Sequence, residues 1–430
     1  MAVVAGRRRG LVGLLSAEGI SRMGTAMSAL AIPWFVLVTT GSATLTGLAA
    51  FAEMLPYVIV AGLAGPVVDR IGARRVAIWS NVVAAGLVAA VPLLHAAGLL
   101  HLSTLLFLVA VIGVARGAAS VTYVLVPGVA EIAGSPIERV TGLHDGINRV
   151  AQMLGAPVAG VLLALYSADV VLVVDAASFA IAGLIMATMV PRAADPKHNA
   201  ELATADEIDH GEGLAGYLSS LREGLRFLRG DRTLVAIAVM VLVTNLLDMA
   251  YGSVLVPVWV RDELGSPLGL GLIAGLFGVG AVAGSALYAW LGPRLPRRRT
   301  FAWSFLLVGA PRFAALALAS TLPPVLIVVL VAGLACGSIN PILGAVEFER
   351  VPRRLQARVL GALGAIAWAG IPVGGLLGGL LVGGLGVTGA LWVCGAGYAV
   401  ATVAPFTLPA FRGFDRGAGT RPAAAVAAHG

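Results

Sequence analysis

Seven of the ionisable side chains inside long apolar segments are candidates for chemistry, in a chain in which charged residues make up only 12% of the total. On insertion scales, a charged side chain at the centre of a membrane helix costs about 2.5–3.5 kcal/mol. Each of these residues is therefore a candidate for carrying a proton or binding a charged ligand. They are Glu18, Arg22, Glu53, Arg116, Asp175, Asp248 and Arg312.

Two carboxylates near the middle of their segments are the first candidates for proton coupling. Glu53 has no basic residue within one helical turn, and Asp248 has Asn245 about a turn away as a hydrogen-bond partner. A carboxylate in such a place could bind and release a proton. Alternatively, Glu53 or Asp248 is a buried partner of Arg116 or Arg22.

Glu18 is a third candidate for proton coupling. It lies four residues before Arg22, so the two side chains share one helix face and could instead neutralise each other as a structural pair. For Asp175 and Arg312 we expect structural roles.

The segments that hold these charges are membrane helices by composition. Hydrophobic residues make up 59% of the chain, the mean hydropathy is +0.94, and soluble domains contain about 25% charged residues. Segments 76–98 and 301–320 carry at most one charge each and are long enough to cross about 30 Å of hydrocarbon. This composition excludes a soluble enzyme, a nucleic-acid-binding protein and a secreted disulfide-rich domain.

Apolar runs between turn signals predict an all-α membrane protein with twelve transmembrane helices. The expected ranges are 11–40, 43–65, 76–97, 101–127, 141–166, 169–190, 233–258, 269–291, 300–320, 323–346, 358–383 and 387–409. We expect an N-terminal six-helix bundle over 1–190, a linker over 191–232, a C-terminal bundle over 233–410 and a tail over 411–430. In the linker, leucines at helical spacing predict an amphipathic helix at the cytoplasmic interface; they are Leu218, Leu221, Leu225 and Leu228.

The basic residues orient these helices. Of 29 arginines and lysines, 24 fall on the side of the N-terminus, four lie within spans, and one, Arg261, falls on the opposite side. Because cytoplasmic loops retain basic residues, we expect a multi-pass protein of the cytoplasmic (inner) membrane with both termini in the cytoplasm.

The two predicted bundles are related by an internal repeat. A shift of 224 residues aligns Pro33 with Pro257, and it aligns Arg70, Arg74 and Arg75 with Arg294, Arg298 and Arg299. Parallel repeats of this kind are typical of transporters that bind their cargo between the halves, near the middle of the membrane.

The loop between the second and third expected helices carries glycines, an acid and arginines at the spacing Gly65, Asp69, Arg70, Gly72, Arg74 and Arg75. It resembles the signature of the major facilitator superfamily, with Ala73 in place of one basic residue. The resemblance implies the major facilitator fold, with two pseudo-symmetric six-helix bundles. It also implies a conformational latch here, with Gly65 at a close helix contact, Gly72 in a tight turn, and Asp69 capping a helix or pairing with an arginine. Alternatively, these arginines only fix the topology.

The fifth expected helix contains Gly155, Pro157 and Gly160, a degenerate form of the superfamily's antiporter motif. Such residues let helices pack closely and bend, which a glycine-rich packing helix would also do. Segments 21–24 and 175–179 are similar to bacterial exporters such as macrolide efflux and enterobactin export proteins, and Arg116 resembles the arginine of proton-coupled drug exporters. That group often has an acid where this chain has Thr25.

The resemblance also indicates which helices line a cavity, namely the first, fourth, seventh and tenth. Few polar and aromatic residues fall on the helices expected near it, which predicts an apolar pocket suited to lipophilic or cationic cargo. The candidates for cargo contact are Arg22, Trp34, Tyr57, Arg116, Tyr123, Asn245, Tyr251, Asn340 and Trp368.

These observations lead to a secondary active transporter that exports lipophilic or cationic small molecules in exchange for protons. The alternatives are a dedicated exporter of one metabolite, such as a siderophore or antibiotic, a transporter for nutrient uptake, and a non-transporting membrane sensor on the same fold. The six histidines are scattered and no nucleophile or phosphate-binding motif is present, so we expect no enzyme activity, cofactor or metal site. The expected partners are a small-molecule substrate, protons and the lipid bilayer, and the protein is expected to be a monomer.

Overall fold

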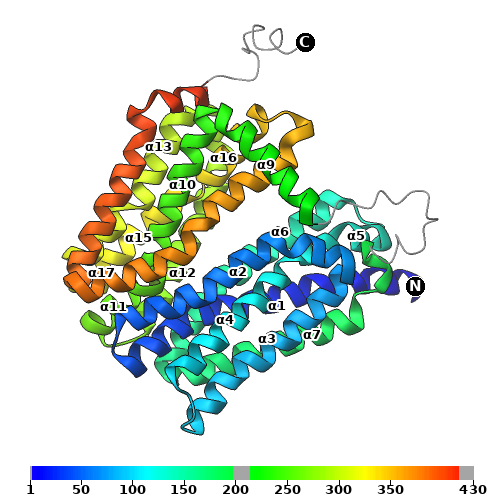
Figure 1. Ribbon diagram of the computed structural model, residues 1–430, viewed down its shortest axis with the longest axis horizontal. Helices are drawn as coiled ribbons and strands as arrows, with labels where there is room; N and C mark the ends of the chain where they lie inside the picture. The colour runs from blue at the N-terminus through cyan, green and yellow to red at the C-terminus, as the bar shows by residue number, and fades with distance from the viewer. Residues whose placement is uncertain (1, 197–213, 416–430) are drawn as a thin grey trace.

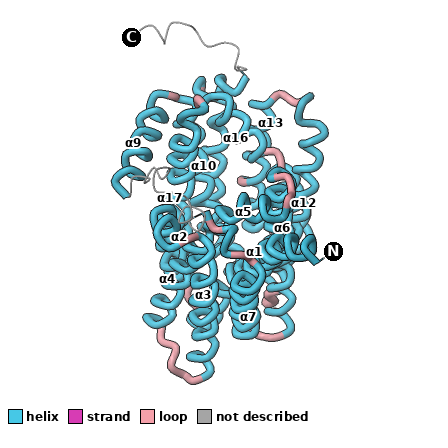
Figure 2. Tube along the Cα trace, turned by 90° about the vertical axis from the view of Figure 1, so that its right-hand side faces the viewer, coloured by secondary structure: helices cyan, strands magenta, loops and turns pink. Residues whose placement is uncertain are grey.

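The computed structural model describes residues 2–196 and 214–415, which form helices joined by short loops, without a strand (Figure 2). The part of the predicted linker over 197–213 and the part of the predicted tail over 416–430 lie outside the described residues. Throughout the described part of the chain, apolar sequence and helix coincide, as expected where backbone groups must be satisfied within each segment.

The N-terminal half contains seven helices that together make six spans. They are α1 (Ala2–Thr40), α2 (Ala43–Ile71), α3 (Ala73–Ala96), α4 (Leu102–Ala119), α5 (Val126–Ala133), α6 (Ile137–Leu165) and α7 (Ala168–Met189). A 3-10 turn, Ser120–Leu125, joins α4 to α5, so that Leu102–Ala133 forms one span.

The C-terminal half begins with α9 (Leu214–Gly230), which precedes the membrane spans. The remaining helices are α10 (Arg232–Ala250), α11 (Val256–Trp259), α12 (Leu268–Leu291), α13 (Arg297–Val308), α14 (Ala310–Leu318), α15 (Leu322–Cys336), α16 (Ile339–Arg350) and α17 (Gln356–Thr407). Two π-helical turns, Tyr251–Leu255 and Val260–Leu264, continue α10 and α11 into one span.

The predicted twelve-helix architecture is confirmed. Eleven helical segments of the described residues are long and apolar enough to cross a membrane, and the last of them, Arg358–Thr407, contains two of the predicted helices. Gly386 interrupts it with a φ of 70°, between the ranges 358–383 and 387–409 expected from the sequence. A left-handed backbone favours glycine, and it lets the chain turn back here without a separate loop.

The internal repeat has structural counterparts in both halves. Gly41 and Gly265, which are 224 residues apart, end equivalent spans with φ values of 68° and 64°. Arg74 donates to the carbonyls of Ala187 and Val190 at the end of α7. The equivalent Arg298 donates to the carbonyls of Pro405 and Phe406 at the end of α17. Each arginine thus binds terminal carbonyls of the last span of its own half, which lack partners within the helix.

The two halves meet at one end and separate toward the other. Figure 1 shows two bundles that diverge toward the side on which the N-terminus lies. At the joined end, a Cβ on Gly47 of α2 would lie 2.3 Å from the Gly375 carbonyl of α17. A Cβ on Gly160 of α6 would lie 2.5 Å from Cα of Gly271 in α12. A Cβ does not fit at either contact, so only glycine allows the two pairs of helices to approach this closely.

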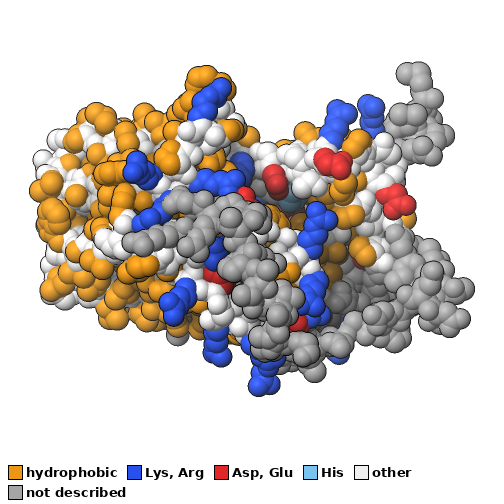
Figure 3. All heavy atoms as spheres, turned by 90° about the horizontal axis from the view of Figure 1, so that it is seen from above, with side chains coloured by type: hydrophobic (Ala, Val, Ile, Leu, Met, Phe, Trp, Pro, Cys, Tyr) orange, Lys and Arg blue, Asp and Glu red, His pale blue; other side chains and the backbone are white. Residues whose placement is uncertain are grey.

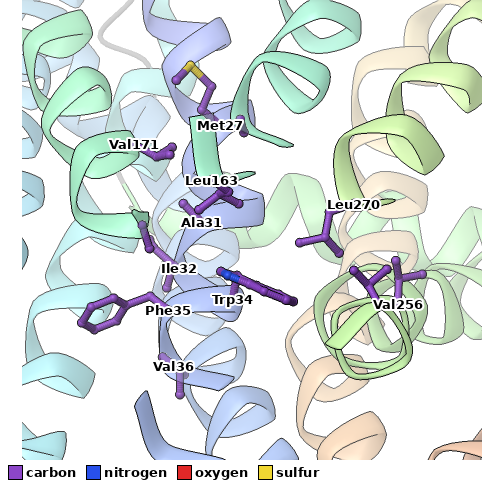
Figure 4. Packing of buried hydrophobic residues seen from close by; sticks show 14 of the residues in the cluster. Met27, Ala31, Ile32, Trp34, Phe35, Val36, Leu163, Val171, Val256 and Leu270 are labelled. Carbon is purple, nitrogen blue, oxygen red and sulfur yellow. The ribbon is translucent and has the colours of Figure 1, made fainter. Parts of the chain in front are cut away.

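A hydrogen bond and apolar packing extend the joined end. Arg261 donates to the carbonyl of Gly41 across the two halves, at 3.3 Å. Figure 4 shows Trp34 of α1 pointing toward Val256 of α11 and Leu270 of α12.

The surface is typical of a membrane protein. On the face in Figure 3, hydrophobic side chains cover the left part, and basic side chains gather in the centre and to the right.

Helix α9 packs on the start of α17. A Cβ on Gly224 would lie 2.3 Å from the carbonyl of Arg358, Leu228 is buried, and Glu223 forms an ion pair with Arg358. A helix thus spans the leucines for which an amphipathic helix is predicted, and one of them, Leu228, contacts protein.

Two glycines bring α4 against α2 at the level of the buried charges. A Cβ on Gly113 would lie 2.1 Å from the Glu53 carbonyl, and one on Gly117 would lie 2.7 Å from the Tyr57 carbonyl. Both distances are shorter than any normal carbon–oxygen contact. This close approach puts Arg116, which lies between the two glycines, beside Glu53.

We expect Gly113→Ala to destabilise the protein by about 1–3 kcal/mol, because the added methyl group forces α4 away from α2. The thermal unfolding midpoint of the purified protein measures this effect. Gly62→Ala is the matched control, since a Cβ there has no heavy atom within 4 Å and alanine favours the helix. Equal midpoints for the two variants would contradict the proposed role of Gly113.

Candidate transport site

A cavity of about 260 Å³ lies mainly within the N-terminal half, against α1, α2 and α4. Met249 and Ser253 of the C-terminal half complete its lining. The sequence-predicted residues that it brings together are Glu18, Arg22, Glu53, Tyr57 and Arg116. The lining is otherwise largely apolar, with Met54, Phe179 and Met186 among its side chains. This combination is typical of a site for a small, largely apolar ligand with a few polar fixing points.

Arg116 joins two carboxylates at the wall of this cavity. Its Nη1 donates to Glu53, and its Nη2 donates to Oδ2 of Asp175 at 3.1 Å. The three side chains come from α4, α2 and α7, and their exposed fractions are 4%, 6% and 0%. Because an unpaired charge is costly at such burial, both carboxylates depend on Arg116, and Arg116 depends on them.

Serines and a glycine complete the surroundings of Asp175. Ser28 of α1 donates to Oδ2 of Asp175, and Ser178 donates to Oδ1 at 3.2 Å. A Cβ on Gly24 would lie 2.2 Å from Oδ1, so only glycine lets α1 pass this carboxylate. The expectation that Asp175 has a structural role is thus consistent with its contacts, although its partner is the cavity arginine.

The cluster Glu53–Arg116–Asp175 has an uneven charge. Two carboxylates share one guanidinium, so the ionised cluster carries a formal charge of −1 in a low-dielectric region. Arg116 Nε is buried and has no hydrogen-bond partner. A proton on one carboxylate, or a cation in the cavity, would remove the excess charge.

Glu18 forms a second polar group at the wall of the cavity. Arg22 Nε donates to its Oε1 at 3.0 Å, as the four-residue spacing predicts. Thr122 donates to Oε2 at 2.5 Å, and His144 Nε2 lies 3.9 Å from Oε1. Glu18 is therefore paired, with Thr122 and His144 as partners that the sequence analysis missed because they lie on other helices.

Asp248 pairs with Arg312 in the C-terminal half, where the two bind at 2.5 Å between Nη2 and Oδ1. The Arg312 guanidinium also lies over the rings of Tyr251 and Phe277, at 4.8 and 5.2 Å from their centroids. The expectation that Asn245 bonds to Asp248 is wrong, because the Asn245 amide donates to the Ala367 carbonyl instead. Unlike the N-terminal cluster, this pair is balanced in charge.

Several predicted cargo contacts do not line the described cavity. Trp34 is buried between the halves, and Tyr251 is buried beneath Arg312. Tyr123 and Asn340 are exposed outside the cavity lining. Trp368 of α17 lies across from Tyr57, and the two rings are stacked. Helical spacing alone could not separate these environments, because each depends on the neighbouring helix.

Arg74 of the predicted latch loop is held within its own half in this conformation. Besides its contacts with α7, Arg74 donates its backbone N–H to Asp195 at 3.0 Å, and Gly72 makes the expected tight turn with a φ of 93°. A Cβ on Gly65 would have no heavy atom within 4 Å, so the close helix contact expected there is absent. Arg70 and Arg75 are exposed, and the Asp69 side chain lies outside the described residues.

The antiporter-like helix lies between α1 and the other half. A Cβ on Gly155 would lie 2.6 Å from Cβ of Ala26 in α1. Pro157 and Gly160 face α12, where a Cβ on Gly275 would lie 2.5 Å from Cγ of Pro157. The motif therefore provides the close packing expected of it, and this packing joins the halves.

The family model described as Major Facilitator Superfamily matches residues 14–253 and 237–424, which together cover most of the chain. The chain belongs to the major facilitator superfamily. It is thus a multi-pass membrane transporter and not an enzyme. Its two halves are the two six-helix bundles of this superfamily, and the cavity between α1, α2 and α4 is its candidate transport site.

Relatives in this superfamily carry efflux names. The chain is 29% identical to the multidrug efflux pump Tap of Mycobacterium tuberculosis, over 94% of each chain. It is 21% identical to macrolide efflux protein A of Streptococcus pyogenes, over 88% of this chain and 92% of that protein.

Solved structures share the fold. The nucleoside transporter NupG has a TM-score of 0.72 at 13% identity, over 94% of this chain and 99% of its own. A bacterial homologue of the lysosomal transporter Spinster, in an inward-facing and unoccupied conformation, has a TM-score of 0.65 at 14% identity, over 95% and 96% of the two chains.

We expect Arg116→Met to destabilise this transporter by about 3–5 kcal/mol, because it leaves Glu53 and Asp175 buried without their cation. Thermal unfolding of the purified variant measures the loss. Arg139→Met on α6 is the control, since Arg139 is exposed and its loss should cost much less. Adding Glu53→Gln and Asp175→Asn to Arg116→Met should restore part of the stability. No recovery in the triple variant would contradict this charge assignment.

Proposed function

We propose that this transporter exports lipophilic or cationic small molecules in exchange for protons, by alternating access of its two halves. The observation that carries the proposal is the Glu53–Arg116–Asp175 cluster, in which two carboxylates share one buried guanidinium at the cavity wall. The efflux names of relatives that align along nearly the whole chain support the direction of transport.

The excess negative charge makes proton and cargo alternatives to each other. In the ionised cluster, a cationic cargo in the cavity balances the charge. When a proton occupies Glu53, the cluster is neutral and the electrostatic attraction for a cation is lost. In both the inward-facing and the outward-facing conformation, either a proton or a cargo cation can then balance the charge of the cluster. Exchange requires that the two alternate in this way.

Contacts of α2 can carry this change to the junction between the halves. Glu53 binds Arg116 on one side of α2, and Gly47 of the same helix packs against Gly375 of α17. A protonated Glu53 accepts a weaker hydrogen bond from Arg116 than the carboxylate does. We propose that the resulting shift of α2 favours separation of the halves at the joined end.

The basic residues support an inward-facing assignment of this conformation. We propose that the arginine-rich ends of the bundles, which diverge here, face the cytoplasm, with both termini inside and the protein in the inner membrane as a monomer. In the opposite conformation, Asp69 and Arg70 of the latch loop would contact the C-terminal half. The pair Asp248–Arg312 is a second, charge-balanced element whose carboxylate is 38% exposed and open to protonation.

Proteoliposomes with an imposed pH gradient test this function. We expect the wild type to accumulate tetraphenylphosphonium, a lipophilic cation, against its concentration gradient when a pH gradient is present. Glu53→Gln should lower the pH-driven rate at least about tenfold, because the excess charge that couples proton and cargo is removed. Exchange of labelled for unlabelled cation without a pH gradient should continue at a higher cation concentration, because the neutral cluster attracts the cation less.

Glu131→Gln is the control, since Glu131 is an exposed carboxylate on α5. Asp248→Asn shows whether the second carboxylate also couples. Full pH-driven transport in both Glu53→Gln and Asp248→Asn would refute the mechanism. Cargo binding by wild-type protein that moves none of its tested ligands would favour the membrane sensor.

A further inference from the structure

Two aromatic side chains from different halves face each other beside the charge cluster. Tyr57 of α2 and Trp368 of α17 have ring centroids 6.3 Å apart and an interplanar angle of 16°. Tyr57 lines the cavity, and Trp368 is 43% exposed. A buried stacked pair would be ordinary core packing, but this pair has accessible ring surface at the border of the cavity.

The pair lies where α2 and α17 begin to separate. The two helices touch at Gly47 and Gly375, and Tyr57 and Trp368 lie about 15 and 10 Å farther along their axes from these glycines. Both rings are thus on the open side of the helix contact. A ligand that enters from the open side of the molecule can reach them without breaking the joined end.

The ring geometry suits a flat ligand. Carbon atoms in contact lie about 3.5 Å apart, so a third ring between two faces needs about 7 Å. The centroids of the Tyr57 and Trp368 rings are 6.3 Å apart, within the range of offset-stacked aromatic pairs, so the two planes must separate before a third ring can enter. A spreading of α2 from α17 that brings the two ring planes about 7 Å apart would admit a planar aromatic group, whereas a bulky tetrahedral group could not stack on both faces.

The neighbouring charge favours a cation. Glu53 lies four residues before Tyr57 on α2 and shares its helix face, and both line the cavity. The cluster around Arg116 has one excess negative charge. Aromatic faces also attract cations through their quadrupole, most strongly in the case of tryptophan.

We infer that Tyr57 and Trp368 form a stacking site for planar aromatic cations, with the cationic group of the cargo directed to the Glu53–Arg116–Asp175 cluster. The inference rests on the proposed function and narrows its cargo class. Because one ring comes from each half, the cargo itself bridges the two bundles. Planar cargo thereby gains a contact that non-planar cations of similar charge lack.

Equilibrium binding to the purified full-length protein tests this selectivity. Ethidium is the planar cationic probe, and tetraphenylphosphonium is the non-planar one. We expect Tyr57→Leu and Trp368→Leu each to raise the Kd for ethidium about tenfold, and to change that for tetraphenylphosphonium less than about twofold. Retained tetraphenylphosphonium binding also shows that the variants are folded.

Conservative variants and a distant tryptophan complete the experiment. Tyr57→Phe and Trp368→Phe keep a ring at each position and should bind ethidium within about threefold of the wild type. Trp79→Leu on α3 should change neither ligand, since Trp79 is an exposed tryptophan that lies outside the cavity lining. Equal losses for both cations, unchanged ethidium binding in the leucine variants, or absence of ethidium binding by the wild type would overturn the stacking site.

Transport separates this inference from the function on which it rests. Planar selectivity that depends on Tyr57 and Trp368, combined with pH-driven transport, would support both. The same selectivity without any pH-driven transport would support the stacking site and contradict proton-coupled export. Proton-driven transport of both cations that is insensitive to the leucine variants would support export and contradict the stacking site.

Discussion

The central constraint on this molecule is the cost of burying charge in a membrane. Arg116 is almost fully buried, and it is tolerated because Glu53 and Asp175 approach it from two other helices. That approach requires small residues at the crossings. Gly113 and Gly117 let α4 reach α2, and Gly24 lets α1 pass Asp175. The glycines of these helices thus set the distances on which the charge cluster depends.

The scaffold is symmetric but the charges are not. Arg74 and Arg298 bind the ends of equivalent helices, and Gly41 and Gly265 end equivalent spans. Asp248, however, aligns with Gly24 at the same offset of 224 residues, so the C-terminal half has a carboxylate where the N-terminal half has none. The N-terminal half holds an unbalanced cluster beside the cavity, and the C-terminal half holds a balanced pair. A duplicated scaffold can therefore provide the motion while one half provides most of the ligand chemistry.

The joined end illustrates how packing and motion are related. Glycine contacts between α2 and α17 and between α6 and α12 bring backbones together without long interlocking side chains. Contacts of this kind stabilise the association through van der Waals packing over a flat surface. The hydrogen bonds that cross between the halves, from Arg261 to the Gly41 carbonyl and from Thr44 to the Gly379 carbonyl, have neutral acceptors and each add little resistance. Such an interface is suited to repeated opening.

The sequence by itself determined the helices, their number and the duplication, because a membrane span needs an apolar segment of defined length. The turn between the last two spans falls at Gly386, between the two expected ranges. It also identified Glu53, Arg116 and Asp248 as costly charges, and the i,i+4 pair Glu18–Arg22, because local spacing fixes which residues share a face. Only the tertiary structure decided the partners. We expected structural roles for Asp175 and Arg312. Asp175 binds Arg116, which is 59 residues away in the sequence, and Arg312 binds Asp248, which is 64 residues away. The stacking of Tyr57 on Trp368 likewise joins two halves. Such pairings depend on the angle and depth at which helices cross, and those are set by packing between distant segments rather than by the periodicity of any one of them.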